Sequence, residues 1–142
     1  AHLRNLDGDH HSSRYANSLM PSKQTLDAFV AMVVGGKHDQ AITDFYLPDS
    51  TMQENLNPPR KGREGNVARE AATMAAFKEI RTTCVAPVFV SGDQVVIHWI
   101  FEFVKNDGSM VRIEELAHQL WDGEKIAEER FYYDPAQMAG MR

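Results

Sequence analysis

The chain has 142 residues, of which 43% are hydrophobic and 25% charged, an ordinary composition for one globular domain. Its net charge of −5 argues against nucleic-acid and anionic-membrane partners, because both require a basic surface. The single cysteine, Cys84, excludes an internal disulfide framework and a cysteine-based zinc site. No apolar run reaches the roughly 18 residues that a membrane span needs.

Residues 1–19 differ from the rest of the chain. They show neither a helical nor a strand period, and they lack the apolar core of a secretory signal. We expect a disordered or tag-like extension here, followed by a single domain over residues 20–142 in a cytoplasmic protein. His10 and His11 are expected to be solvated, and no metal site is predicted.

Three helices are predicted in the first half of the chain. The first covers residues 22–36, capped by Ser22 and ended by paired glycines. A shorter one covers residues 37–46, and the third covers residues 63–80. The third helix is expected to place its apolar residues on one face: Val67, Ala71, Met74, Phe77 and Ile80.

One strand is predicted between the second and third helices. Pro48 and Asp49 are expected to turn the chain into a strand over roughly residues 50–55, and residues 57–62 form a loop by their proline and glycine content. Glu54 and Asn55 lie at the end of that strand, at the rim of any cavity that the sheet encloses.

From residue 82 onward the hydrophobic period is two, and short turns separate four strands. These strands are predicted at 82–90, 94–104, 110–121 and 125–133, with Pro87 marking a bulge or an edge position. The order predicts an α+β fold, in which helices cover one face of a strongly curved antiparallel sheet.

Residue parity separates the two faces of this sheet. The inner face is predicted to carry large apolar residues on the last three strands: Ile97, Trp99, Phe101, Phe103, Val111, Ile113, Ala117, Trp121 and Phe131. The same register places polar residues inside: Glu115, Gln119, Glu129 and Tyr133. A one-residue bulge would instead turn Glu114 and His118 inward. The outer face is predicted to carry His98, Ile100, Leu116, Leu120, Ile126 and Tyr132.

The inward carboxylates are the most informative feature of the pattern. Burial of a carboxylate is costly unless it is paired or protonated, and an apolar pocket raises its pKa toward neutrality. Glu115 and Glu129 are therefore candidate acids or bases. The structural alternative is that they pair with Arg63, Arg69 or Lys78 at the cavity edge.

Two stretches resemble the nuclear transport factor 2-like superfamily, in its SnoaL-like polyketide cyclase and ketosteroid isomerase-like branch. They are LPDSTMQENLNPPRKGREG and LWDGEKIAEERFYYD, and the resemblance covers about residues 22–135. It implies a cystatin-like, cone-shaped curved sheet packed against three helices. It does not imply one activity, because the fold hosts isomerases, cyclases, hydrolases, dehydratases and binding proteins.

The catalytic residues of these relatives are only partly present. The resemblance to ketosteroid isomerases places Glu54 at the general-base position, but Ala117 stands where they carry an oxyanion-hole aspartate, and the first helix has no tyrosine. Phe131 replaces the catalytic aspartate of SnoaL-like cyclases. Asn55 matches a water-positioning asparagine of limonene epoxide hydrolases, whose catalytic triad is absent here. His98 and His118 resemble the histidine pair of scytalone dehydratases.

Two functional hypotheses follow. The first is cofactor-free proton transfer, an isomerisation or cyclisation, on a small apolar carbonyl or polycyclic compound. Glu54 would be the base, Glu129 or Glu115 the protonated acid and Tyr133 a hydrogen-bond donor. The second is a non-catalytic ligand-binding or assembly module of the same fold. Either would bind its ligand through Asn55, Trp99, Phe101, Phe103, Gln119, Trp121 and Phe131. We also expect a homodimer that forms through the outer sheet face.

Overall fold

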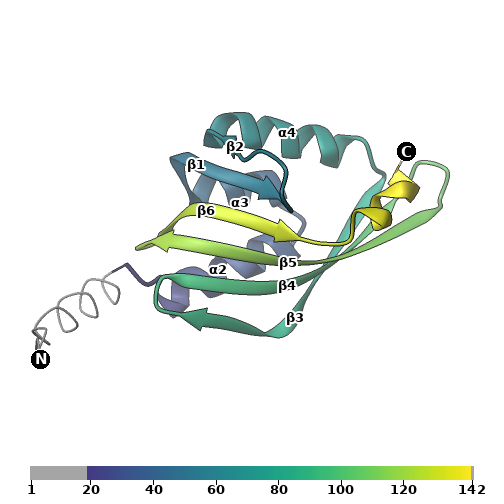
Figure 1. Ribbon diagram of the computed structural model, residues 1–142. Coiled ribbons are helices and arrows are strands. Elements are labelled where there is room, and N and C mark those ends of the chain that lie inside the picture. Colours follow the sequence, from purple (N-terminus) through teal and green to yellow (C-terminus); the bar gives the residue numbers. More distant parts are fainter. Residues whose placement is uncertain (1–18, 142) are drawn as a thin grey trace, which may run out of the picture.

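The computed structural model describes residues 19–141, so the predicted extension lies almost wholly outside the described residues. One sheet dominates the fold, with the strand order β2-β1-β6-β5-β4-β3. The strands are β1 (Tyr46–Glu54), β2 (Arg60–Lys61), β3 (Glu79–Ser91), β4 (Gln94–Val104), β5 (Met110–Asp122) and β6 (Lys125–Tyr132). Figure 1 shows the long strands bending together, which gives the sheet a concave and a convex face.

Helices cover the concave face. They are α2 (Lys23–Val34), α3 (His38–Phe45), α4 (Arg63–Ala75) and the short 3-10 helix η2 (Pro135–Met141). In Figure 1, α2 and α3 lie behind the sheet, α4 runs along the β1 side, and η2 lies at the far end of the β4–β5 hairpin. The predicted α+β class, with helices on one side of a curved sheet, is confirmed. No helix in residues 19–141 is long and apolar enough to cross a membrane.

The pairing of the strands is mixed. Strands β3 to β6 form the predicted antiparallel meander. Strand β1, however, runs parallel to β6. This parallel pairing joins the first strand to the last, so the polar end of β1 lies beside the end of β6.

Two predicted boundaries are wrong. Strand β1 begins at Tyr46, and Pro48 lies within it, because the β1–β6 register shifts between Tyr46 and Thr51 and Pro48 has no partner in that ladder. Helix α4 ends at Ala75, short of the predicted residue 80. The amide of Lys78 already donates to Val104 O, so pairing with β4 replaces the last helical turn.

Pro87 behaves as its sequence context predicts. Strand β3 is the edge of the sheet, and its pairing with β4 shifts register between Val85 and Phe89. A proline is tolerated there because neither an edge strand nor a bulge requires its missing amide proton.

The predicted inner face of β4 and β5 is confirmed. Trp99 pairs with Glu115, and Ile97 pairs with Ala117, in the even register that parity requires. Ile97, Trp99, Ile113, Ala117 and Trp121 are all buried, and most of this set joins α2, α3 and β1 in the hydrophobic core.

Ile126 is a correction to the predicted outer face. It is fully buried and belongs to the core. The β5–β6 register shifts between Leu120 and Trp121: Leu120 pairs with Glu128, and Trp121 pairs with Ile126. Ala127 is therefore the extra residue of a β-bulge, which turns Ile126 inward beside Trp121 while Glu129 keeps its predicted face.

Candidate functional site

A cavity of about 280 Å³ lies between the helices and the concave face of the sheet. Its apolar lining comes from α2, α3, β4, β5, β6 and η2, whereas its polar lining comes mainly from β1, α4, β5 and β6. The polar and titratable lining residues are His38, Tyr46, Glu54, Arg60, Asn66, Arg69, Glu70, Thr73, Glu115, Glu129 and Tyr133. The cavity is large enough for a small organic molecule.

The four predicted catalytic residues, Glu54, Glu115, Glu129 and Tyr133, all line this cavity. Four of the predicted ligand-binding residues also line it: Trp99, Phe101, Phe103 and Phe131. The stacked Trp99 and Phe101 rings, with centroids 6.0 Å apart, form an aromatic wall.

Asn55, Gln119 and Trp121, also predicted to bind ligand, do not line the cavity. Asn55 has a positive φ of 50°, and its side-chain Oδ1 accepts a hydrogen bond from the amide of Tyr133 at 3.0 Å. Its role is to join the end of β1 to the residue after β6. Gln119 and Trp121 are buried behind Glu129.

Glu129 is held by a chain of hydrogen bonds. Tyr46 Oη donates to Glu129 Oε1, and Gln119 Nε2 donates to Glu129 Oε2 at 2.6 Å. Trp121 Nε1 in turn donates to Gln119 Oε1 at 3.0 Å. Burial raises the pKa of Glu129 to about 7, although the two hydrogen bonds oppose that rise. Glu129 therefore titrates near neutral pH.

Glu115 lies in a different environment. Within residues 19–141 it has neither a hydrogen-bond nor an ion-pair partner, and it projects from β5 next to the aromatic wall. Burial raises its pKa to about 8, and the nearby charges of Glu129, Glu54 and Glu70 add to the rise. Glu115 is consequently a neutral carboxylic acid at pH 7, able to donate a hydrogen bond.

Glu54 forms an ion pair with Arg60. Arg60 Nη1 contacts Glu54 Oε2 at 2.5 Å, and both side chains are about a quarter exposed, at 24% and 28% respectively. Asn66 holds the other side of Arg60, since its Oδ1 accepts from Arg60 Nε and its Nδ2 donates to Arg60 O. Strand β2 and the start of α4 thus hold the Glu54 carboxylate in the cavity lining.

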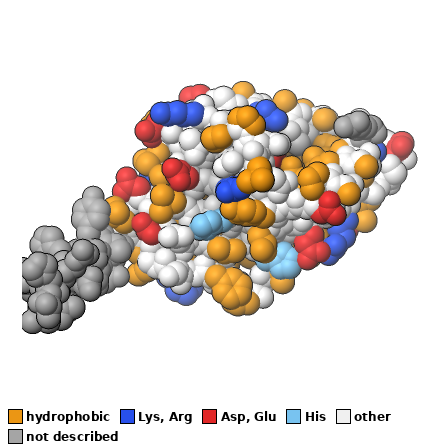
Figure 2. Space-filling model, in the orientation of Figure 1, with side chains coloured by type: hydrophobic (Ala, Val, Ile, Leu, Met, Phe, Trp, Pro, Cys, Tyr) orange, Lys and Arg blue, Asp and Glu red, His pale blue; other side chains and the backbone are white. Residues whose placement is uncertain are grey.

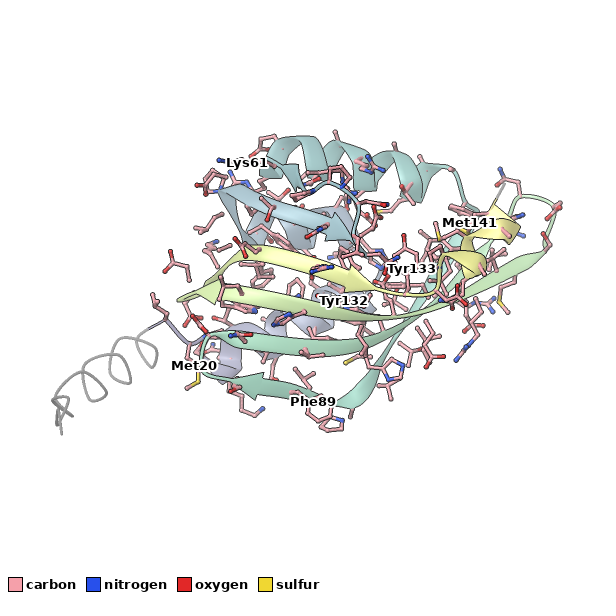
Figure 3. All side chains as sticks on the ribbon, in the orientation of Figure 1. Met20, Lys61, Phe89, Tyr132, Tyr133 and Met141 are labelled. Carbon is pink, nitrogen blue, oxygen red and sulfur yellow. The ribbon has the colours of Figure 1, made fainter. Side chains whose placement is uncertain are left out.

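Tyr133 completes this end of the cavity. Burial raises the pKa of its phenol, and the negative charges of Glu54 and Glu115 raise it further. Tyr133 therefore remains a proton-bearing donor at neutral pH. Figure 3 shows Tyr133 just beyond β6, on the side where η2 and Met141 close the end of the sheet.

Several polar lining groups were missed by the sequence analysis, among them Tyr46 and His38. Tyr46 was assigned to the end of a helix, because Pro48 was taken as the turn before the first strand. His38 belongs to a second polar cluster and lies between two of its members: its Nδ1 lies 3.4 Å from Glu70 Oε1, and its Nε2 lies 2.7 Å from Thr82 Oγ1. The inward parity of Thr82, opposite Phe101, was the available signal for that cluster.

The two outer histidines lie away from the cavity, on the face that parity predicts. His98 contacts Glu114 at 2.6 Å, and His118 contacts Gln94 at 2.8 Å. Nor do the arginines and lysine considered as edge partners pair with the inner carboxylates. Arg63, for example, contacts the exposed Glu64 and donates to Tyr46 O. No group of three His, Cys, Asp or Glu residues in the described part of the chain could hold a metal ion.

The chain belongs to the SnoaL-like domain family, whose sequence profile matches residues 26–129. The matched segment runs from α2 to Glu129 and so includes strands β1 to β5 and the first part of β6. A comparison with curated proteins found no match.

Solved structures share the fold at low sequence identity. A protein from Jannaschia sp., provisionally assigned as a SnoaL-like polyketide cyclase, is 16% identical with a TM-score of 0.66, over 80% of this chain and 88% of that one. A hypothetical protein with a ketosteroid isomerase-like fold from Catenulispora acidiphila, solved with trimethylamine, is 18% identical with a TM-score of 0.68, over 84% and 92%. TerC, co-crystallised with polyporic acid, is 14% identical with a TM-score of 0.68, over 82% and 94%.

Proposed function

We propose that this SnoaL-like protein catalyses cofactor-free proton transfer on a small, largely apolar carbonyl compound. The observation that supports the proposal most strongly is the presence of a neutral acid, Glu115, and an arginine-paired glutamate, Glu54, in the lining of one cavity. Glu115 carries a proton at pH 7 and has no partner among residues 19–141, whereas Glu54 is held in an ion pair with Arg60.

The chemistry is an enolisation. A substrate carbonyl oxygen accepts a hydrogen bond from Glu115, which stabilises the negative charge that develops there. Glu54 removes the proton from the adjacent carbon, and Tyr133, which lines the same cavity, offers a further donor. The aromatic wall formed by Trp99 and Phe101 binds the apolar part of the molecule and excludes water.

The relatives support the substrate class only in outline. TerC was co-crystallised with polyporic acid, and several of the similar structures are provisionally assigned as polyketide cyclases. A polycyclic or aryl-bearing ketone of a size suited to about 280 Å³ is therefore our first choice of substrate.

Hydrogen–deuterium exchange tests the proposal without knowledge of the product. A panel of aryl ketones and diketones is incubated with the protein in heavy water, and proton NMR measures loss of the hydrogen next to the carbonyl. We expect exchange that Glu54→Gln abolishes and that Glu115→Gln slows at least tenfold. The wild-type rate should fall above about pH 8, where Glu115 loses its proton.

Two control variants carry the same change on the outer face. Glu114→Gln and Glu128→Gln alter the residues next to inner carboxylates in sequence and should leave exchange unchanged. Equal exchange in the wild type and in both Glu54→Gln and Glu115→Gln would refute the proposal.

The second candidate function is ligand binding without catalysis. The observation that favours it is the extent to which the carboxylates are already engaged: Arg60 pairs with Glu54, and Tyr46 and Gln119 occupy both oxygens of Glu129. Under this alternative the panel ketones bind, but the protein does not accelerate their hydrogen–deuterium exchange, so no variant changes the exchange rate.

A further inference from the structure

The hydrogen-bond chain behind the cavity has a direction. An indole N–H can only donate, so Trp121 requires Gln119 to accept with its oxygen. The amide group of Gln119 must then present its N–H to Glu129 Oε2, at 2.6 Å. Glu129 Oε2 is thereby fixed as an acceptor.

This direction leaves one position for a proton on Glu129. When the carboxyl is neutral, its proton belongs on Oε1, where Tyr46 Oη is the neighbouring acceptor. Tyr46 then no longer donates to Glu129, so its own O–H is released. Because the Tyr46 side chain lines the cavity, that O–H becomes available to a molecule bound there.

We propose that Tyr46 is a catalytic proton donor to the substrate oxygen, resupplied by Glu129 through the directed chain that starts at Trp121. This inference rests on the proposed enolisation. It supplies a second donor beside Glu115, so the cavity presents two donors to the developing oxyanion.

The proton movements balance. Glu54 takes the proton from the substrate carbon. The electron pair of the broken C–H bond forms the C=C bond of the enol, and the π pair of the carbonyl moves to its oxygen. That oxygen takes the proton of Tyr46 Oη, and Tyr46 takes the proton from Glu129 Oε1. The products are a neutral enol, protonated Glu54 and a Glu129 carboxylate, and the reverse sequence returns the proton to the substrate.

Several charged groups face this pair and set its titration. Glu70 on α4 and Glu115 on β5 both raise the pKa of Tyr46, after burial and Glu129 itself. Burial and Glu70 raise the pKa of Glu129, to about 7. His38 on α3 lies against Glu70, and the ion pair of Glu54 and Arg60 also belongs to the cavity lining.

Pentafluorophenolate provides a test that needs no turnover. It carries an oxyanion throughout the neutral pH range, and pentafluoroanisole is its neutral counterpart of nearly the same shape. Fluorine NMR measures the affinity of both between pH 6 and pH 9. We expect wild-type affinity for the anion to fall about tenfold in a step near pH 7, as Glu129 ionises and recaptures the Tyr46 hydroxyl.

The variants separate the relay from simple charge repulsion. In Glu129→Gln the new amide oxygen can accept from Gln119 while its N–H donates to Tyr46, which reproduces the protonated arrangement at every pH. This variant should bind the anion tightly and without the step near pH 7, keeping only a step near pH 8 from Glu115. Tyr46→Phe should weaken the anion about tenfold at pH 6 and leave pentafluoroanisole unchanged.

The outer-facing Glu128→Gln and Tyr132→Phe are the matched controls and should behave as the wild type. Weak anion binding by Glu129→Gln, equal to that of Tyr46→Phe, would overturn the proposal, as would no binding of the anion by the wild type.

A measurement on the unmodified protein covers the case in which Tyr46→Phe fails to fold. Carbon-13 labels on glutamate carboxyls and tyrosine ring carbons should show Tyr46 and Glu129 changing together with one midpoint. A Tyr46 chemical shift that stays constant while Glu129 titrates would contradict the relay, but it would not change the result expected from the exchange assay. If the wild-type protein instead exchanges none of the panel ketones, the enolisation is refuted, whereas the coupled titration of Tyr46 and Glu129 would still be observed.

Discussion

Glu115 and Glu129 line the same cavity, but their different hydrogen-bond partners give them different pKa values. Glu129 has two hydrogen-bond donors, which favour its charged form, whereas Glu115 has none among residues 19–141. Both are desolvated, so both pKa values rise, but Glu115 rises further, to about 8 against about 7. The absence of donors is what makes Glu115 the acid.

The raised pKa of Glu115 has a cost in stability that depends on pH. Between its ordinary value of 4.5 and about 8, the folded state binds more protons than the unfolded state. The free energy of unfolding should therefore fall as pH rises through this window and level off above it. Below pH 4.5 both states are protonated, and Glu115 imposes no penalty.

Glu115→Gln should remove this dependence. Urea unfolding should measure the free energy of unfolding of the variant and of the wild type at pH 5 and at pH 9. The difference, variant minus wild type, should be larger at pH 9 than at pH 5 by about 3 kcal/mol, a figure that allows for partial solvent access to the carboxyl. Glu129 titrates in both proteins and cancels in the comparison. If the difference between variant and wild type is the same at both pH values, Glu115 is not desolvated in the folded protein.

Some of these residues could be predicted from the sequence. Parity on strands 110–121 and 125–133 was enough to predict that Glu115 and Glu129 face inward, because the pairing is regular around Glu115 and from Glu128 onward. Tyr46 and His38 could not be predicted in the same way. Both lie at helix–strand or loop–helix boundaries, where no period exists, and their partners Glu129 and Thr82 lie far away in sequence.

At the scale of elements, the bulge at Ala127 determines which side chain of β6 packs in the core beside Trp121. It places Ile126 next to Trp121, fully buried, while Leu116 on the other face of β5 remains 46% exposed. A regular hairpin would have exposed Ile126 instead. The turn itself gives no local sign of the extra residue, so the error came from assuming regular alternation.

Matched truncations test the bulge. Ile126→Ala should lower the free energy of unfolding by about 3 kcal/mol, because a buried side chain is lost and a cavity remains. Leu116→Ala, on the exposed face, should cost less than about 1 kcal/mol in a monomer. Equal costs, measured by chemical denaturation, would mean that Ile126 faces outward.

The start of α2 is tied to the β5–β6 hairpin through one side chain. Ser22 Oγ accepts from the amide of Thr25 at 3.1 Å and donates to Glu124 Oε2 at 2.9 Å, while the amide of Ser22 donates to Glu124 Oε1 at 3.0 Å. The cap therefore also orients the helix that covers the cavity.

Ser22→Ala should destabilise the protein by about 1 kcal/mol, the usual cost of a lost N-terminal cap. Lys23→Ala is the control: its ion pair with Asp27 is exposed, so its loss should be nearly neutral. A thermal-melting experiment that finds both changes neutral would show that the cap contributes nothing to stability.

The strands of the meander were predictable because period-two alternation and turn residues agree along residues 94–133. The limits of β1 and α4 were not, because each depends on a distant partner. The pairing of β1 with β6 extends the strand back across Pro48, and the pairing that begins at Lys78 ends the helix. Local sequence carries no record of those contacts.

For the whole molecule, the convex face of the sheet is the feature that the cavity does not explain. Figure 2 shows hydrophobic side chains mixed with histidine and charged groups across this face. Leu116 and Tyr132 are 46% and 42% exposed, and Phe89 at the β3 edge is 60% exposed. Such a mixture of apolar and polar groups is typical of a surface that another protein covers.

The predicted homodimer would bury this face. Sedimentation velocity at micromolar concentration should report twice the chain mass of 16.0 kDa. Leu116→Glu should shift the equilibrium to monomer, because it places a charge in the proposed interface, whereas Lys61→Glu at the opposite edge of the sheet should not. A wild-type protein that sediments as a monomer would contradict the prediction.

The proposed chemistry requires above all a neutral carboxylic acid inside the cavity at physiological pH. The most direct measurement is a carbon-13 NMR titration of glutamate carboxyl groups, with Glu115→Gln used to assign the signal. The predicted result is a Glu115 midpoint near pH 8, well above that of the exposed glutamates. A midpoint near the ordinary value of 4.5 would leave the cavity without its acid and contradict the proposed chemistry.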